Sequence, residues 1–110
     1  MTKKLDIEYT ATAYDVIYED DPDMAQEMAA KAALVHQIEA IRKDRGLTQA
    51  QLADAISLDQ SDVSRMLNGH FHGLALSRLM QCLTRLNRDV SIVVQKHEGS
   101  GKAGIAVATA

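Results

Sequence analysis

The sequence is poor in the residues that large aromatic cores, disulfide frameworks and membrane spans require. Its 110 residues include no tryptophan, one phenylalanine and three tyrosines. The one cysteine, Cys82, has no partner for a disulfide within the chain, which favours a reducing compartment. No apolar run approaches the ~20 residues that cross a bilayer, and the first residues lack an apolar signal core. We therefore expect a cytoplasmic protein without a membrane segment.

The composition indicates one Ala- and Leu-rich, mostly helical domain with a modest core, since 46% of the residues are apolar and 25% are charged. The net charge of −3 is unevenly distributed. Residues 1–28 hold eight carboxylates and two lysines, whereas residues 29–97 hold nine Lys or Arg against six Asp or Glu. An acidic leader on a mildly basic body indicates either two surfaces with two partners or a solvated tail that aids solubility.

A long first helix is predicted over residues 21–45. Asp21 is placed to cap it, Pro22 suits its first position, and Gly46 supplies a left-handed stop after the basic last turn. Its expected buried stripe is Ala30, Leu34, Ile38 and Ile41.

Three shorter helices should follow. Thr48 and Gln51 form a capping-box pattern ahead of the apolar residues of one helix, Leu52, Ala53 and Ile56. Asp59 can cap the next helix, residues 60–67, which Asn68 and Gly69 close. The last helix covers about residues 74–86 and should bury Leu76, Leu79, Met80, Leu83 and Leu86.

Alternating residues predict extended segments at both ends. Residues 3–18 carry a weak strand signal or form a tail that orders on a partner, and residues 89–97 are predicted to be a β-strand. The resulting organisation is an acidic leader over residues 1–20, a helical domain with a C-terminal strand over residues 21–97, and a flexible tail over residues 98–110.

Two short helices joined by a tight turn, the second with a polar outer face, are typical of a helix-turn-helix. The segment 48–69 resembles the Cro and lambda-repressor-like XRE family. The resemblance rests on Thr48-Gln49, Leu52-Ala53, Gln60, Val63-Ser64 and Asn68-Gly69 at the family's spacing. It implies a mainly α, lambda-repressor-like fold, here with a long first helix and a C-terminal β-strand, and sequence-specific binding of double-stranded operator DNA without a cofactor.

The turn departs from the family pattern, because Ser57 stands where the family usually has glycine. The backbone there tends towards positive φ, so we expect a cost of about 1 kcal/mol.

The expected DNA contacts lie on and beside the second helix of the motif. Gln can pair with adenine and Arg with guanine in the major groove, and amides at helix ends can hold phosphates. The resemblance places Gln60, Ser61 and Arg65 at base-reading positions, with Ser64 also outward, and Gln49 and Asn68 at phosphate-clamping positions. Asp62 either supports the cap or accepts from cytosine, and Arg65 alternatively forms a surface salt bridge.

Other reactive residues favour plain roles. His70 and His72 are expected to be loop histidines near phosphates, the alternative being a metal pair, and Cys82 a small buried residue. Three arginines should either touch the DNA backbone or form a solvated face: Arg78, Arg85 and Arg88. We expect no metal site and no enzyme, since nothing resembles a catalytic constellation.

The segment 89–97 needs a partner, because an exposed apolar edge is a liability. We expect a homodimer with this segment at or near its interface, the alternative being a monomer in which residues 5–10 pair with it. The span 14–96 resembles HigA-type antitoxins, which implies a basic RelE/HigB-like ribonuclease toxin as partner and repression of the protein's own operon. A stand-alone XRE-type regulator and a helical protein-interaction module remain alternatives.

Overall fold

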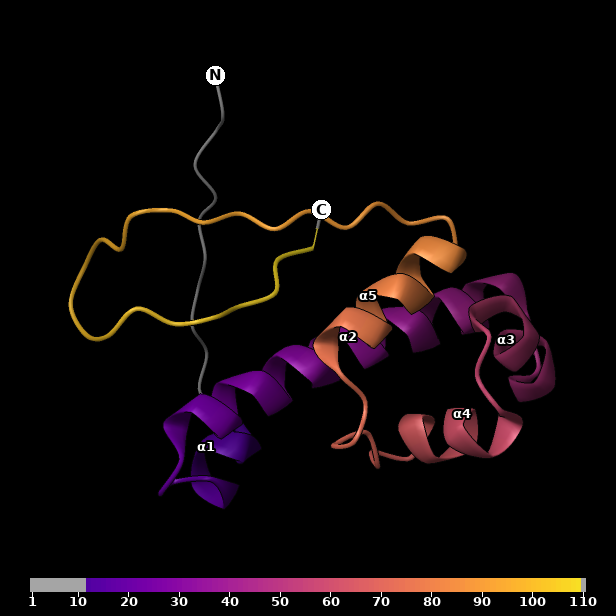
Figure 1. The fold of residues 1–110 in the computed structure, drawn as a ribbon, viewed down its shortest axis with the longest axis horizontal. Coiled ribbons are helices and arrows are strands. Elements are labelled where there is room, and N and C mark those ends of the chain that lie inside the picture. Colours follow the sequence, from indigo (N-terminus) through magenta and orange to yellow (C-terminus); the bar gives the residue numbers. More distant parts are fainter. Residues whose placement is uncertain (1–11, 110) are drawn as a thin grey trace.

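The computed structural model of the protein describes residues 12–109, which form an all-helical fold (Figure 1). A long helix runs the length of the molecule, a later helix packs along it, and two short helices lie at its C-terminal end. The helices are α1 (Ala13–Ile17), α2 (Pro22–Arg45), α3 (Gln49–Ile56), α4 (Gln60–Leu67) and α5 (Leu76–Arg85).

The predicted ends of α2 are confirmed. The Asp21 carboxylate accepts a hydrogen bond from the amide of Met24 at 3.2 Å, and Pro22 occupies the first helical position, where its missing amide costs nothing. Gly46 ends the helix in the left-handed region, with φ of 65°. The predicted stripe Ala30, Leu34, Ile38 and Ile41 is buried.

The core lies where α2, α3, α4 and α5 meet. Each helix contributes side chains without solvent exposure, including Ile38, Leu52, Ile56, Val63, Met66 and Leu79. The aliphatic core explains how a chain with one phenylalanine, Phe71, closes its interior. It also fixes α3 and α4 against the long helix, and thereby the orientation of the helix-turn-helix.

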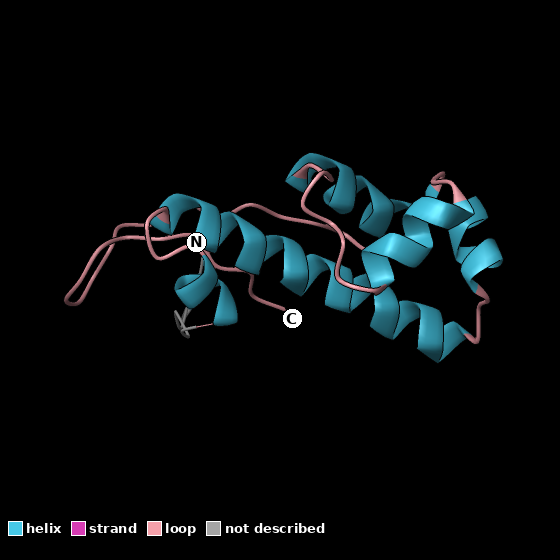
Figure 2. Ribbon diagram, turned by 90° about the horizontal axis from the view of Figure 1, so that it is seen from below, coloured by secondary structure: helices cyan, strands magenta, loops and turns pink. Residues whose placement is uncertain are grey.

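The predicted C-terminal β-strand is wrong: residues 12–109 contain helices and loops but no strand (Figure 2). Residues 89–97 are extended, but Ile92 is 75% and Val94 is 93% exposed. Alternation favours an extended chain with one apolar face, yet a strand also needs a neighbouring strand for its hydrogen bonds. The chain instead turns near residues 99–101 and runs back (Figure 1), and the Ile105 amide donates to Oε1 of Gln26 on α2 at 3.0 Å.

The weak strand signal over residues 3–18 is also wrong where it can be compared. Residues 3–11 lie outside the described part of the chain, and Ala13–Ile17 is helical. Thr12 and Asp15 form a capping box at its start. Tyr14 and Tyr18 are half-buried and pack on the core, whereas Val16 between them is 74% exposed. The buried face therefore repeats every four residues, as a helix requires.

Within residues 12–109, none of the helices combines the length and apolarity that a bilayer crossing demands.

Candidate nucleic-acid interface

The first helix of the motif, α3, is fixed at its start by the predicted capping box. Thr48 Oγ1 accepts from the amide of Gln51 at 3.1 Å, and Gln51 Oε1 accepts from the amide of Thr48 at 2.9 Å. Leu52, Ala53 and Ile56 are buried towards the other helices. The cap and the apolar face together hold Gln49 at the N-terminal end of α3, half-buried.

The turn between α3 and α4 has the predicted left-handed residue. Ser57 adopts φ of 57° and ψ of 45°, and the next amide, of Leu58, donates to the carbonyl of Ala53 at 3.1 Å. Leu58 is half-buried and packs on the core. An L-residue in this region costs about 1–2 kcal/mol relative to a right-handed helical residue. Packing of the two helices therefore maintains a strained turn.

Two arginines of α5 hold this turn, a role different from the DNA-backbone contact or solvated face expected of them. Arg78 Nη2 donates to the carbonyl of Ser57 at 2.6 Å, and Arg85 Nη1 donates to the carbonyl of Ile56 at 3.1 Å. These carbonyls end α3 and have no partner within the helix. The signal was their spacing: Arg78, Cys82 and Arg85 share one side of α5, and Cys82 is buried. The arginines therefore border the buried face that meets α3.

Cys82 is a buried thiol, as expected from the sequence. Its burial raises the pKa of the thiol, and the positive charges of Arg78 and Arg85 counteract that shift only in part. The neutral thiol packs as a small apolar group.

The second helix of the motif, α4, has one buried and one open face. Val63 and Met66 have no solvent exposure, whereas Gln60, Ser61 and Arg65 are exposed. Ser64 lies between the two faces, half-buried. Asp59 occupies the predicted cap position but makes no side-chain capping hydrogen bond. The outward face is thus free of the protein's own chain within residues 12–109, and the major groove of DNA is wide enough to admit an α-helix.

Arg65 and Asn68 have partners on their own helix. The guanidinium of Arg65 donates to the carboxylate of Asp62, one turn earlier, and the two form an ion pair. The Asn68 side-chain amide donates to the Ser64 carbonyl at 2.8 Å and closes the end of α4. The structure therefore groups five of the six predicted contact residues on and directly after α4, and it places Gln49 at the start of α3.

Lys31 of α2 holds the loop that follows α4. This buried lysine donates from Nζ to the carbonyl of His72 at 2.8 Å and lies 3.4 Å from a carboxylate oxygen of Glu27. His70 and His72 are exposed. Within residues 12–109, no three His, Cys, Asp or Glu side chains are grouped so that they could hold a metal ion.

The helix-turn-helix itself is acidic. Residues 48–69 contain three aspartates, Asp54, Asp59 and Asp62, and one basic residue, Arg65. General electrostatic attraction of this surface to nucleic-acid phosphates is therefore weak.

A capped helix, a left-handed turn and a second helix with an open polar face define a helix-turn-helix domain. A family model described as a helix-turn-helix domain matches residues 17–95. A solved structure named as an XRE family transcriptional regulator is 32% identical, with a TM-score of 0.74, over 78% of this chain and 98% of that one. A search of the curated proteins found no match. The chain belongs to the XRE helix-turn-helix family.

Proposed function

We propose that this protein is a transcriptional repressor that inserts α4 into the major groove of operator DNA. The observation that carries the proposal is the exposed polar row Gln60, Ser61 and Arg65, opposite the fully buried Val63 and Met66. A helix held in this way can present its side chains to base edges without unfolding its own core. Membership of the XRE helix-turn-helix family supports a DNA-binding transcriptional regulator.

Each contact residue has a distinct role in this proposal. Arg65 pairs with guanine O6 and N7, and Gln60 pairs with adenine N6 and N7. Ser61 and Ser64 have shorter side chains, and their hydroxyl groups contact bases or sugars. Gln49, at the start of α3, and Asn68, at the end of α4, hold phosphates and set the register of α4 in the groove.

Selection from a pool of randomised duplexes tests the proposal. Wild-type protein is expected to enrich a defined sequence. Arg65→Ala should lower affinity for that sequence by about 1–3 kcal/mol and relax the preference at one base position, whereas Gln49→Ala should weaken all sequences alike. If the wild type enriches no sequence, or if both variants bind the enriched duplex as the wild type does, α4 is not the recognition helix.

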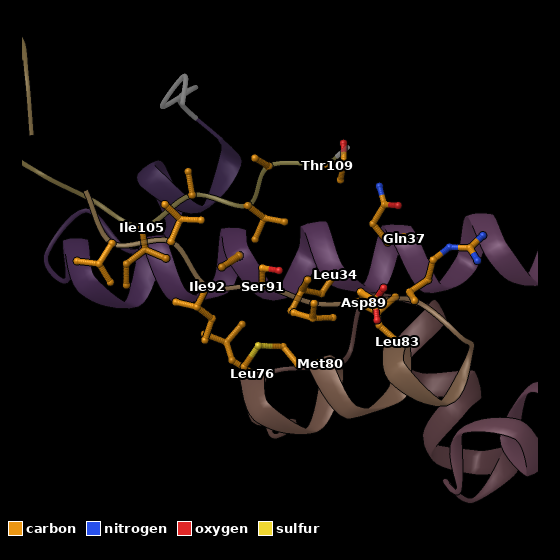
Figure 3. Close-up of a pocket in the computed structure, with 18 of the residues that line it drawn as sticks. Leu34, Gln37, Leu76, Met80, Leu83, Asp89, Ser91, Ile92, Ile105 and Thr109 are labelled. Atoms are coloured by element: carbon orange, nitrogen blue, oxygen red, sulfur yellow. The ribbon is translucent and has the colours of Figure 1, made fainter. Parts of the chain in front are cut away.

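Dimerisation through the C-terminal segment is a second part of the proposal. The side chains of Leu34 on α2 and of Leu76 and Met80 on α5 border a groove of about 760 Å³, together with Ile92 and Ile105 (Figure 3). Since Ile92 and Val94 are exposed and the same segment borders the groove, a twofold-related copy can bury both apolar surfaces at once. Two recognition helices would then read two half-sites about one DNA turn apart.

The dimer is tested by light scattering after size-exclusion chromatography. The wild type should have twice the mass of the 12.0 kDa chain. The Val94→Glu variant should have a lower mass, closer to that of the monomer. Val16→Glu on α1, at a site 74% exposed, is the matched control and should leave the mass unchanged. A monomeric wild type would overturn the dimer and leave the DNA proposal standing.

A role as an antitoxin is the second candidate function. Val16 and Ile17 on α1 are 74% and 65% exposed. Five exposed carboxylates lie on α1 or between it and the first turn of α2: Asp15, Glu19, Asp20, Asp21 and Asp23. Exposed apolar residues with acids close to them in the sequence support binding to a basic protein such as a RelE/HigB-like ribonuclease, with repression of the shared operon.

Co-expression with a basic RelE/HigB-like protein encoded next to this gene tests the antitoxin role. Growth should be restored by the wild type and lost with Ile17→Asp. If no such gene is adjacent, the protein is a stand-alone XRE-type regulator. If, in addition, the wild type enriches no duplex from the randomised pool, the protein is a helical protein-interaction module.

A further inference from the structure

We infer that Asp62 determines the specificity of the recognition helix by directing Arg65 to a base edge and away from phosphates. The inference rests on the proposed function, in which α4 reads the major groove. The Asp62 carboxylate accepts from Nη2 of Arg65, one helical turn away, and the two side chains are 36% and 66% exposed. Arg65 is therefore exposed, as Gln60 and Ser61 are, and Asp62 lies half-buried at its side, at the border between the open and the buried face of α4.

The geometry of a guanidinium makes this contact selective. Arginine has five N–H donors in a planar fork, and one carboxylate oxygen occupies only part of them. The remaining donors can reach O6 and N7 of guanine, which are neutral acceptors. A DNA phosphate would have to approach the same fork beside the Asp62 carboxylate, and two like charges repel. The Asp62 carboxylate therefore disfavours a contact between Arg65 and a phosphate more than a contact between Arg65 and guanine.

The surrounding charge makes this restraint effective, because Arg65 is the one basic residue in the motif, residues 48–69. An arginine free to move would pair with phosphates on any sequence and raise non-specific affinity. When Asp62 restrains it, Arg65 contributes to the binding affinity chiefly on sequences that present guanine to it. Two unit charges about 4 Å apart in water interact by an amount that corresponds to roughly a fivefold change in affinity.

The test compares two duplexes: the one enriched by the wild type and a scrambled duplex of the same composition. Asp62→Asn should bind the scrambled duplex about fivefold more tightly and lower the ratio of specific to non-specific affinity by a similar factor. Its non-specific salt slope should rise by about one, because Arg65 then neutralises a phosphate. Unfolding of the variant would weaken both affinities equally and leave their ratio unchanged.

Asp54→Asn is the matched control, since Asp54 is an exposed acid on α3 and the change of charge is the same. It should leave the affinity ratio unchanged. In an Arg65→Ala background, Asp62→Asn should also leave the ratio unchanged, because the residue that Asp62 directs is gone.

Three results would overturn the inference. An equal loss of specificity in Asp54→Asn would mean that net charge alone acts. An equal loss in the Arg65→Ala background would mean that Asp62 acts without Arg65. A lost preference for one cytosine, with unchanged affinity for the scrambled duplex, would make Asp62 a base reader. If the wild type binds both duplexes alike, the proposed function itself fails.

Discussion

Ser57 offers a direct test of how the helix-turn-helix is held, because it adopts a left-handed backbone that glycine adopts without strain. Its φ of 57° and ψ of 45° lie at the centre of that region. Replacing Ser57 by glycine removes a strain of about 1–2 kcal/mol. The greater freedom of glycine in the unfolded chain offsets about 0.4–1 kcal/mol of this gain. We expect Ser57→Gly to raise the free energy of unfolding by about 0.5–1 kcal/mol.

The assay is urea unfolding followed by circular dichroism, with a thermal midpoint expected to rise by about 2–6 °C. Both backbone contacts of the turn survive the change: the Ser57 carbonyl still accepts from Arg78, and the amide of Leu58 still donates to Ala53. Affinity for the enriched duplex should therefore stay the same.

Two control variants isolate the backbone contribution. Gly46→Ala changes a residue with φ of 65°, where no heavy atom of the described chain, other than those of Gly46 and its two neighbours in sequence, lies within 4 Å of an added Cβ. It should lower the free energy of unfolding by about as much as Ser57→Gly raises it. Asn87→Gly, at φ of 63°, should gain less, because asparagine tolerates this region better than serine. A Ser57→Gly variant no more stable than the wild type, with Gly46→Ala behaving as expected, would refute the strained turn.

Substitutions at three further positions test contacts that stabilise the fold. Lys31→Ala should lower the free energy of unfolding by about 2 kcal/mol, because it removes a buried charged hydrogen bond to the His72 carbonyl. Lys31→Met should lose less, since it keeps the buried stem, and a Lys31→Met variant as stable as the wild type would show that the bond contributes nothing. The hydrogen bond from Arg42 lowers the pKa of Glu39 below 4.5, so the stability it gives is present above that pH and lost as the pH falls through the lowered pKa. Urea midpoints measured from neutral pH to about pH 3 should therefore decline less steeply in Glu39→Gln, and an unchanged slope would contradict this. Burial raises the pKa of the Cys82 thiol above 9.0. The neutral thiol therefore contributes its full stabilisation of the fold below the usual thiol pKa, and this stabilisation is lost as the pH rises through the raised pKa. The alkaline loss of stability should be shallower in Cys82→Ala, and identical alkaline curves would contradict the burial effect.

The helix boundaries were predictable because their signals are local. Asp21 and Pro22 begin α2, Thr48 and Gln51 begin α3, and each acts within four residues along the chain. The left-handed turn at Ser57 was predictable for the same reason, together with the resemblance to the family. The outward face of α4 followed from the helical period, although its role towards DNA remains a prediction.

The two strand predictions were wrong for different physical reasons. In the segment around α1, Tyr14 and Tyr18 are four residues apart, a separation that lies on one face both in a strand and in a helix. Only Val16 distinguishes the two, and it is exposed. Residues 89–97 have the expected extended backbone, but no part of residues 12–109 provides the second strand that a sheet requires. A partner that is distant in sequence, or on another molecule, leaves no local signal.

The contacts from α5 to the turn were missed because long polar side chains reach across helices. Arg78 and Arg85 looked like a solvated face or a contact with the DNA backbone, yet each ends on a carbonyl at the end of α3. Their target is the backbone of another helix, more than twenty residues earlier in the chain. Side-chain identity alone could not reveal this pairing.

The most direct test of the central claim is an NMR titration of ¹⁵N-labelled protein with the duplex that it enriches from the randomised pool. We predict that the amides of Gln60, Ser61, Ser64 and Arg65 shift most, followed by those at the start of α3. Amides at the centre of α2, on the far side of the core, should move little. Shifts confined to α1 or to residues 89–109, with α4 unchanged, would contradict the assignment of α4 as the helix that reads DNA.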